Sequence, residues 1–520
     1  MKKMDRILLA ANLTLATQLH VGSGDDSPLC DAMIYRRPDG ALIIPGSSAA
    51  GALRGRATHL FSSLRGEKKC LSLSGITDRE CDCPTCAMFG NIYPDAGSSN
   101  NRLSAKILVH DMEIQLADGT SIRDGVGINR VSRTSNSAAA AKYDYETVPR
   151  GAQLVLRMEA TGLTDKEEVL LAALLAEIGE GRIRFGGKSS RGLGRVSLDN
   201  VAAWRLPQCT PAQWTQFYAL LTSDDWFLQG GQEIANWFSR RLEEARRLFA
   251  GSDDTFLIIS GTLRFKEGFL TKESFLTVES PYDSFPLLVT ERGKRRTCLP
   301  GSSLRGVLRF QTERIGRTLA ELNNLAGWLV ACDPLAAGES EPGRSCSRRP
   351  DKKNGNECLA CKLFGSMHAG SRLKISDAWE IEAGKFYLQD YLAVDRFTGG
   401  GSEGKKFDSV YTYRPGYYIE ILFEEPEAWE LGWLLLTLRD LNEGLVSVGS
   451  GRAKGLGKAA ISEGKVMVKS SLFSEGTERY SGALTVREYN FKKFMQSPEA
   501  QRQVEKFHTR LLELAGEGVK

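Results

Sequence analysis

The segment IPGSSAAGALR at residues 44–54 returns as LPGSSLRGVLR at residues 299–309. Each copy leads to a cysteine-rich segment that ends in Cys-x-x-Cys-x-x-Phe-Gly, which is CPTCAMFG at 83–90 and CLACKLFG at 358–365. Each half then closes on a glycine-rich basic segment, FGGKSSRGLGRV at 185–196 and VGSGRAKGLGKAAI at 448–461. Because three motifs recur in the same order, the sequence predicts two whole domains in tandem rather than a solenoid of small repeats.

The composition is that of a globular protein, with 42% hydrophobic and 25% charged residues in a chain of 520. The net charge of +4 permits an anionic partner but does not require one. No targeting segment is recognisable at the start, and apolar runs such as VLLAALLAEI are too short to span a bilayer. We therefore expect a cytoplasmic protein without membrane contact, in which clustered cysteines are metal ligands rather than disulfides.

Each half allows the same order of elements: an opening strand, a helix after PGSS, short strands, a second helix and a closing strand. Ser47, Ser48, Ser302 and Ser303 are candidate N-caps of the first helices. Strand–helix–strands–helix–strand is the ferredoxin-like pattern, so we predict an α+β protein with two tandem ferredoxin-like (RRM-like, βαββαβ) domains. The predicted boundaries are 1–206 and 253–470 for these domains, 207–252 for a helical connector, and 471–520 for a partly helical tail.

The cysteine clusters have the composition of zinc sites. They comprise Cys70, Cys81, Cys83 and Cys86 in the first half, and Cys332, Cys346, Cys358 and Cys361 in the second. Four thiolates suit tetrahedral zinc, and a Cys-x-x-Cys pair supplies two ligands from one tight turn. The surrounding loops are too polar to fold on a core of their own, so we predict two structural Zn²⁺ ions. Scattered reduced cysteines are the alternative.

The glycine-rich segments place cations beside glycines, with Lys188 and Arg191 in the first half and Arg452 and Lys454 in the second. Glycine lets a phosphate approach backbone N–H groups closely, and the cations neutralise its charge. Neither segment is a P-loop, because the Gly-Lys-Ser/Thr ending is absent. A twisted hairpin with solvated cations is the alternative.

A further basic stretch precedes the second helix of each half, at 127–151 and 393–416. Gly/Ser/Ala-rich loops that carry cations and tyrosines are typical of a finger laid along a nucleic acid strand, although a disordered surface loop is the alternative. The candidate RNA-contacting cations are Arg130, Arg133 and Lys142 in the first stretch, and Arg396, Lys405 and Lys406 in the second.

The PGSS helix, the Gly-Leu-Gly-Arg/Lys segment and the ferredoxin-like frame together resemble the RAMP superfamily of CRISPR proteins. The likeness covers both halves and is strongest to backbone subunits of type III effector complexes, above all to the double-domain subunits of III-D-type complexes. It implies a ribonucleoprotein with guide RNA, complementary target RNA and other effector subunits as partners. It also implies that each domain grips guide RNA while a thumb-like hairpin, here 127–151 and 393–416, interrupts the guide–target duplex.

The resemblance further implies a metal-dependent endoribonuclease whose catalytic aspartate lies between the first strand and PGSS, in an Asp-x-Pro-Val/Leu context. This places the residue at Asp26 in GSGDDSPLCDAM and at Asp283 in VESPYDSFPLLV, with Asp25 and Asp31 as rivals. RNA supplies its own 2′-hydroxyl nucleophile, so positioning provides most of the acceleration. The aspartate would hold Mg²⁺ or Mn²⁺ or accept a proton. An aspartate that merely forms an Asx-turn is the alternative.

The two halves differ directly after PGSS. The family favours Leu-Lys/Arg-Gly there, and the second half keeps this pattern with Arg305, followed by Arg309. The first half has Ala50 instead, so its grip on guide phosphate is expected to depend on Arg54 and Arg56.

Three other functions remain open from the sequence. One is a non-catalytic RNA-binding subunit of the same kind of complex. Another is a guide-processing RAMP nuclease with His20 as general base, although the second half has no matching histidine. The last is a zinc-stapled nucleic-acid-binding protein outside CRISPR. Binding in each case is expected to depend strongly on salt.

Overall fold

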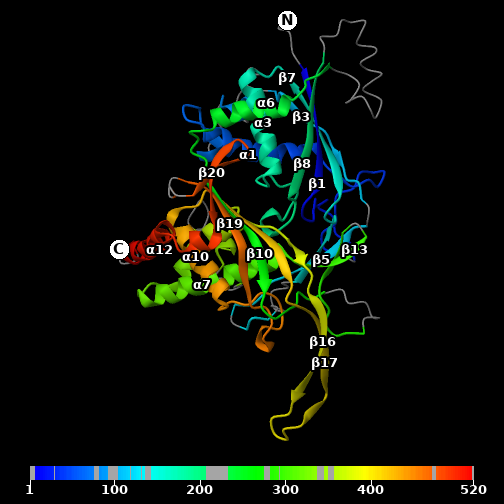
Figure 1. Ribbon diagram of the computed structural model, residues 1–520, viewed down its shortest axis with the longest axis vertical. Coiled ribbons are helices and arrows are strands. Elements are labelled where there is room, and N and C mark those ends of the chain that lie inside the picture. The colour runs from blue at the N-terminus through cyan, green and yellow to red at the C-terminus, as the bar shows by residue number, and fades with distance from the viewer. Residues whose placement is uncertain are drawn as a thin grey trace.

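The structure is a computed structural model that describes residues 6–28, 30–74, 81–91, 104–116, 119–130, 132–134, 142–206, 232–273, 281–291, 293–335, 345–348, 357–470, 473 and 476–517. It confirms the α+β class and two successive units with antiparallel sheets (Figure 1). We call residues 6–206 unit 1 and residues 253–470 unit 2. No helix among the described residues is long and apolar enough to cross a membrane.

Unit 1 has the ferredoxin-like order of elements. They are β1 (Arg6–Leu15), α1 (Gly46–Ser62), β3 (Ile107–Val109), β7 (Gln153–Thr161), α3 (Asp165–Gly179) and β8 (Val196–Leu206). The sheet runs β3-β7-β1-β8-β9, where β9 (Gln232–Glu233) adds an edge strand. Buried and exposed residues alternate along β7, as expected for a strand with one face on a core. A capping box of Thr164 and Glu167 starts α3.

Unit 2 repeats this order and is longer. Its elements are β10 (Phe256–Phe265), α7 (Gly301–Leu322), β14 (Leu373–Ile375), β15 (Ala378–Glu382), β18 (Gly416–Glu424), α10 (Ala428–Glu443) and β19 (Ala459–Lys469). At one edge β15 pairs with β13 (Lys294–Leu299), which pairs with β12 (Leu288–Glu291). At the other, β21 (Leu484–Asn490) and β20 (Thr477–Ser481) extend the sheet beyond β19.

The C-terminal segment therefore contains a β-hairpin as well as helices. After β21 come α11 (Phe491–Met495) and α12 (Pro498–Glu517). The ring of Phe507 stacks on Trp433 of α10 at 4.8 Å. A Cβ at Gly432 would lie 2.0 Å from the carbonyl oxygen of Gln503, so only glycine allows α12 to pack this closely. This segment is thus an integral part of the core of unit 2.

The first helix of each unit starts in a way that the sequence did not reveal. α1 and α7 begin at Gly46 and Gly301, after Pro45 and Pro300, and no serine side chain caps them, so the predicted serine N-caps are wrong. Asp111 and Asp377 act instead, because each accepts a hydrogen bond of 2.7 Å from the glycine N–H. A Cβ at Gly46 would lie 2.1 Å from the carbonyl oxygen of Val109, which explains why the motif needs a glycine at this position.

Each unit carries a hairpin between its central strands. In unit 1 it is β5 (Ser121–Val126) with β6 (Lys142–Thr147), and in unit 2 it is β16 (Lys385–Val394) with β17 (Gly401–Tyr413). The second projects far from the body (Figure 1). The predicted fingers at 127–151 and 393–416 omitted the first strand of each hairpin. The stretch at 135–141 lies outside the described residues.

Shorter elements complete the inserts. They are β2 (Ile43–Ile44), α2 (Pro84–Phe89), β4 (Met112–Glu113), β11 (Gly268–Phe269), α8 (Gly327–Val330) and α9 (Leu359–Phe364). In the connector, α6 (Trp237–Leu248) packs on α3 through a 3.0 Å hydrogen bond from the indole of Trp237 to Glu168. Most of the predicted helical connector, residues 207–231, lies outside the described residues.

The helices of unit 1 are enclosed between the two sheets. In β10, Phe256 and Ile258 join the hydrophobic core of unit 1, whereas Leu257 and Ile259 join the core of unit 2. One sheet therefore supplies both cores with alternate residues of the same strand. The two units consequently pack as continuous layers of sheet, helices, sheet and helices.

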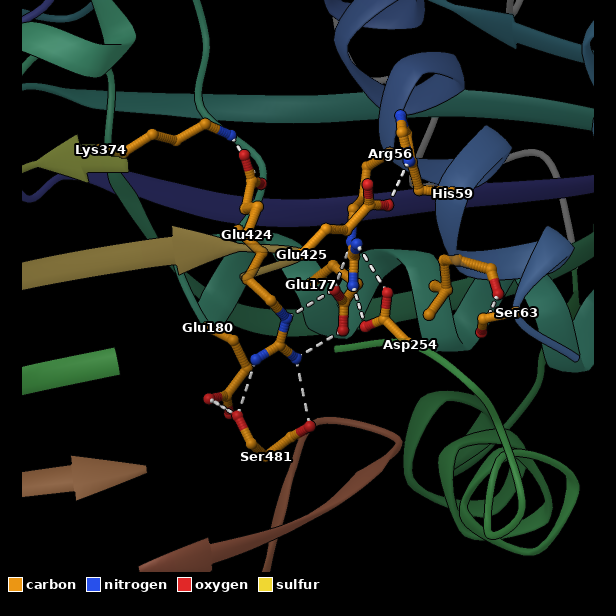
Figure 2. A network of polar contacts seen from close by, with 12 residues as sticks. Arg56, His59, Ser63, Glu177, Glu180, Asp254, Lys374, Glu424, Glu425 and Ser481 are labelled. Atoms are coloured by element: carbon orange, nitrogen blue, oxygen red, sulfur yellow. Dashed lines mark hydrogen bonds and ion pairs between the residues drawn. The ribbon is translucent and has the colours of Figure 1, made fainter. Parts of the chain in front are cut away.

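A buried ion-pair network holds this arrangement in place (Figure 2). Arg56 of α1 donates to Glu177 of α3 and to Asp254 at the start of unit 2, each at 2.7 Å. Arg182 donates to Glu177 at 2.6 Å and to the hydroxyl of Ser481 in the β20–β21 turn at 2.8 Å. Such pairs tolerate little displacement, because a lost partner leaves a buried charge. Arg56, a predicted RNA ligand, is thus engaged inside the protein.

Candidate nucleic-acid interface

A cavity of about 1040 Å³ lies between the two units. Its walls are the β5–β6 hairpin of unit 1, the N-terminal half of α7, and the glycine-rich loop of unit 2. Its lining carries far more cations than carboxylates. The cations are Arg123, Arg130, Arg133, Arg191, Lys272, Arg305, Arg309, Arg314, Arg452 and Lys454, and the carboxylates are Asp124 and Glu273. A concave cationic surface of this kind raises the local concentration of anions.

The N-terminus of α7 forms part of the cavity wall. Ser302 and Ser303 of its first turn line the wall beside Arg305. Arg305 donates to the carbonyl oxygen of Phe364, while its buried Nε has no hydrogen-bond partner among the described residues. Burial, followed by the charges of Arg309 and Arg191, lowers the pKa of Arg305 to about 9. A guanidinium in this environment lacks an anion, and a helix N-terminus favours one at the same place.

In a second part of the cavity wall, two arginines are already paired with a carboxylate. Glu313 of α7 accepts from Arg309 at 2.8 Å and from Arg130 of unit 1 at 2.7 Å. Arg309 also donates to the sulfur of Cys361 at 3.4 Å, which connects the cavity to the cysteine cluster. These two arginines shape the cavity more than they contribute free charge to it.

Like charges from different segments meet elsewhere in the cavity. Burial and the nearby Arg133 of unit 1 lower the pKa of Arg452 in unit 2. Burial and Lys272 likewise lower the pKa of Lys454. The ammonium of Lys454 also lies over the rings of Tyr391 and Phe407, at 3.8 and 4.1 Å. Like charges held together in this way are stabilised by a bound polyanion, because it neutralises both at once.

The corresponding surface of unit 1 is more open. Ser47 and Ser48 are exposed on the first turn of α1, and Ala50 stands where unit 2 has Arg305. Arg191 donates to the hydroxyl of Tyr143. Burial and Arg191 lower the pKa of Lys188, whose ammonium lies 4.5 Å from the centre of the Tyr145 ring. Arg54 is half-buried, one turn after Ala50.

The two hairpins share a pattern that sequence analysis missed. Lys142 pairs with Asp124 at 3.2 Å, and Lys406 pairs with Asp390 at the same distance. Apolar residues flank each aspartate on its face of the hairpin: Ile122, Val126 and Ile128 in unit 1, and Leu388, Leu392 and Val394 in unit 2. Both sets are exposed, and the first set lines the cavity between the units. Alternation with period two in these segments was the signal that could have identified them.

The remaining predicted cations lie on the second hairpin. Arg396 is exposed in the turn between β16 and β17, and Lys405 is exposed on β17. Neither belongs to the cavity between the units.

In each unit we call the loop between the first strand and PGSS the acidic loop. Each acidic loop is joined to the hairpin of its unit by reciprocal hydrogen bonds between two aspartates. The N–H of Asp31 donates to Asp144, and the N–H of Asp144 donates to Asp31, at 3.1 and 2.9 Å. Asp283 and Asp408 make the same pair of bonds at 2.8 and 2.9 Å. The structure therefore equates Asp283 with Asp31, and not with Asp26.

Asp26 lies in a different setting. Its side chain is exposed and makes no hydrogen bond or ion pair within the described residues. Backbone hydrogen bonds join Ser27 to Cys30 directly after it, and the carbonyl oxygen of Asp25 directly before it accepts from the N–H of Met33. The position of unit 2 that corresponds to Asp26 falls among residues 274–280, outside the described residues. Catalysis by either aspartate stays a prediction.

His20 is placed inside unit 1. Only 4% of its surface is exposed, its Nδ1 lies 2.8 Å from the carbonyl oxygen of Glu146, and burial lowers its pKa. A general base must reach the proton it removes. This position does not favour the guide-processing hypothesis.

Both cysteine clusters assemble as the spacing predicted. Cys70, Cys81, Cys83 and Cys86 form one buried group, and Cys332, Cys346, Cys358 and Cys361 form another, with the sulfurs of each group within 4.8 Å of one another. The sulfurs of Cys332 and Cys361 are 3.6 Å apart. A tetrahedral zinc site with Zn–S bonds of about 2.3 Å separates its sulfurs by about 3.8 Å. The donor sets thus fit Zn²⁺.

Backbone groups complete the second cluster. The N–H groups of Cys332, Cys346 and Cys358 each point at a cysteine sulfur at 3.4–3.5 Å. Such contacts orient thiolate ligands and disperse their charge. With four thiolates and no open position, zinc here would staple the insert, and it would supply no site for a substrate.

A family model for the RAMP superfamily matches residues 12–197 and 254–460, which together make up more than half of the chain. The chain belongs to the RAMP superfamily. This superfamily comprises CRISPR-associated RNA-binding proteins and includes RNA endonucleases. No curated protein matches the chain.

Proposed function

We propose that the chain is a backbone subunit of a type III CRISPR effector complex, which binds guide RNA in the cavity between its units and cleaves complementary target RNA. The observation that carries the proposal is Arg305, a half-buried arginine at the N-terminus of α7 whose buried Nε has no hydrogen-bond partner in the described structure. The RAMP frame makes RNA the expected anion.

The cavity can distinguish an RNA strand from a single phosphate. Arg305 and the first turn of α7 suit one backbone phosphate, and the Arg133–Arg452 pair suits another. In the same cavity, Ile122, Val126 and Ile128 of the hairpin offer apolar contact to a ribose or a base. Alternation of cationic and apolar groups along a groove is what a single strand needs.

The cleavage step uses the nucleophile that RNA carries. The 2′-hydroxyl oxygen of a target nucleotide attacks the adjacent phosphorus and gives its proton to the carboxylate of Asp26. The bond from phosphorus to the 5′-oxygen of the next nucleotide breaks, and that oxygen takes a proton from water. The products are a 2′,3′-cyclic phosphate and a 5′-hydroxyl. A divalent cation such as Mg²⁺ or Mn²⁺ near this carboxylate would stabilise charge on the phosphate.

Asp283 is the second proposed catalytic residue, and its setting is less favourable. One of its oxygens accepts the N–H of Asp408, so the carboxylate also fastens the loop to the hairpin. A non-catalytic role for unit 2 is the alternative that this contact supports.

RNA binding is tested on the purified chain. Fluorescence anisotropy with a labelled single-stranded RNA compares wild type, Arg305→Ala and Arg502→Ala, whose residue is exposed on α12 away from the cavity. We expect about tenfold weaker binding for Arg305→Ala, a loss of about 1.4 kcal/mol, and no change for Arg502→Ala. Equal affinities of all three proteins would contradict the proposed site.

Cleavage is tested on the assembled complex with labelled complementary RNA. Asp26→Ala should abolish one cut and Asp283→Ala another, while RNA binding is retained. Asp283→Asn separates the two roles of that residue, because the amide oxygen still accepts the N–H of Asp408 but is a poor base. If both cuts survive in the Asp26→Ala, Asp283→Ala double variant, the non-catalytic alternative stands. A chelator then shows whether cutting requires a divalent cation.

A further inference from the structure

The hairpins of the two units carry a lysine–aspartate pair at the same place. The Nζ of Lys142 lies 3.2 Å from the carboxylate of Asp124 in unit 1, and the Nζ of Lys406 lies 3.2 Å from that of Asp390 in unit 2. Neither lysine lines the cavity between the units. In each hairpin the aspartate of the pair lies opposite the aspartate that is bonded to the acidic loop. This repeated position points to a role in the chemistry of that loop.

In unit 1 a short path leads from this pair to Asp26. Asp26 directly precedes, and Asp31 directly follows, the backbone bridge between residues 27 and 30, so the two aspartates flank one turn. Asp31 is bonded to Asp144 of β6. Lys142 lies two residues before Asp144 in this strand, on the same face and about 7 Å away along it. One turn and two strand positions thus separate Asp26 from Lys142, a span that a phosphate with its two neighbouring sugars can bridge.

Asp124 holds the lysine in a defined place. Its side chain is 6% exposed, and its two oxygens accept no hydrogen bond among the described residues, so the ammonium of Lys142 compensates its charge. A buried carboxylate that loses its cation is costly, and the ammonium is therefore kept against Asp124. The side chain of Lys142 is nevertheless 57% exposed. Its remaining ammonium protons are accessible to a strand that lies on the hairpin.

The proposed cleavage needs a proton donor on the side of the leaving group. As the bond to the 5′-oxygen breaks, negative charge develops on an oxygen whose conjugate acid is an alcohol, and such an oxygen leaves slowly unless it is protonated. An ammonium is charged at neutral pH and is a stronger acid than an alcohol, so it can supply this proton. Because the attacking and leaving oxygens are in line, the base and the acid must act on opposite sides of the phosphate.

We propose that Lys142 is the general acid of the cut made by unit 1, and that Asp124 is the positioning residue that keeps its ammonium in place. The inference rests on the proposed cleavage by Asp26. The 2′-hydroxyl gives its proton to Asp26, the bond from phosphorus to the 5′-oxygen breaks, and that oxygen takes its proton from Lys142 in place of water. The neutral amine of Lys142 and the protonated carboxyl of Asp26 then return to their charged forms by proton exchange with water.

The matching pair of unit 2 is less well placed for this role. The side chains of Lys406 and Asp390 are 67% and 61% exposed, so water competes for the ammonium and holds it less firmly. Asp283, at the position of Asp31, accepts the N–H of Asp408 with one oxygen. We therefore expect Lys406 to contribute less to cutting by unit 2 than Lys142 contributes to cutting by unit 1.

A substrate with a better leaving group tests this role. The assembled complex is given, in single-turnover reactions, either complementary RNA or the same RNA with sulfur in place of the 5′-oxygen at the cut that Asp26→Ala abolishes. A thiolate leaves without a proton. On ordinary RNA, Lys142→Ala should make this cut about 100-fold more slowly than wild type. On the sulfur-substituted RNA, the variant and wild type should cut at rates within about twofold of each other, because no general acid is needed.

Two further variants separate proton donation from attraction of phosphate. Lys142→Arg keeps the positive charge and the ion pair with Asp124, but a guanidinium does not give up a proton, so this variant should be as slow as Lys142→Ala on ordinary RNA and equally rescued by sulfur. Lys166→Ala is the matched control, because Lys166 is an exposed lysine of α3 that pairs with Glu67. It should cut both substrates like wild type. Asp124→Asn should show the leaving-group dependence of Lys142→Ala with a smaller defect.

The outcomes distinguish this inference from the proposed cleavage on which it rests. Wild-type cutting of ordinary RNA by Lys142→Ala, an equal defect on both substrates, or full activity of Lys142→Arg overturns the role as general acid and leaves the proposed cleavage intact. If wild type cuts neither RNA, or if no cut depends on Asp26, the proposed cleavage is refuted and this inference with it. Anisotropy and circular dichroism on each variant establish that the rates compare folded protein with RNA bound.

Discussion

The PGSS helices of the two units are alike in sequence and unlike in environment. α7 begins beneath the glycine-rich loop of unit 1, and its half-buried Arg305 lines a cationic cavity. α1 begins with exposed serines, and Ala50 stands in place of that arginine. The comparison teaches that the motif forms only one wall of the cavity. The other wall comes from the preceding unit, so among the described residues the PGSS helix of unit 1 has no such second wall.

We expect the largest effect from loss of a cysteine cluster, and this loss can be compared between the two units. Cys83→Ser and Cys361→Ser should each lower the zinc content from two ions per chain to one, measured by inductively coupled plasma mass spectrometry. Structural zinc contributes about 10–16 kcal/mol of binding free energy in small sites, so the affected insert should become sensitive to proteases. RNA affinity should fall only for Cys361→Ser, because Arg309 contacts that sulfur. Equal losses of affinity would mean that the clusters act alike.

We expect the next largest effect from the buried polar pairs that join the two helices of each unit. Arg56→Ala removes the cation that pairs with buried Asp254 and one of the two arginines that pair with buried Glu177, so it should cost about 3–5 kcal/mol in free energy of unfolding. Gln311 occupies the corresponding position of unit 2 and donates to Asp440. Gln311→Ala should cost only about 1–3 kcal/mol, because a neutral donor is lost. Urea unfolding followed by tryptophan fluorescence measures both, and a reversed order would refute the assignment.

A smaller effect is expected from supplying unit 1 with the cation it lacks. Ala50→Arg restores the position of Arg305 on a PGSS helix that has no second wall among the described residues. It should strengthen RNA binding by about 1 kcal/mol, or about fivefold, in low-salt anisotropy measurements. Ala50→Gln controls for side-chain length. A gain with glutamine would show that charge is not the cause.

We expect the smallest effect from pH, which should destabilise the acidic loop of unit 1 before that of unit 2. Glu146 accepts from Arg36, Thr120 and the N–H of Ile34, and these bonds hold its pKa at about 2 against burial. Val410 occupies the corresponding position of unit 2. Because the folded pKa lies below the usual value, the stabilisation is complete above about pH 4.5 and is lost as pH falls toward 2.

The loop of unit 1 should therefore loosen in acid before that of unit 2. Pepsin digestion between pH 4.5 and 2.5, with the cut sites identified by mass spectrometry, should show earlier cleavage within residues 21–35 than within 281–291. In Glu146→Gln the susceptibility of the first loop should no longer change with pH. Simultaneous cleavage of both loops in wild type would exclude this cause.

The sequence was sufficient for features that are local and repeated. The order of strands and helices in each half and the cysteine spacing each predicted what the structure shows. The serine caps were wrong because the group that caps Gly46 is Asp111, far along the chain and invisible to a local pattern.

The candidate site was harder to predict from the sequence, because the partners of its residues lie far along the chain. Arg56 and Arg305 both follow PGSS by a few residues, yet one is paired inside the protein and the other lines the cavity. Only the packing of unit 2 on α1 distinguishes them. Likewise, Asp26 and Asp283 share a local context, and the hydrogen bonds of Asp31 were needed to show that they are not equivalent.

The network of Figure 2 has a consequence for the order in which the protein is made. Arg182 is synthesised 299 residues before Ser481, whose hydroxyl and carbonyl oxygen it needs. At about 5–20 residues per second, a ribosome takes about 15–60 s to cover that distance. Until β20 and β21 emerge, the second sheet that covers the helices of unit 1 is incomplete. The nascent chain is thus exposed to aggregation at its first domain until its last strands emerge, and a chaperone that shields α1 and α3 would act in that window.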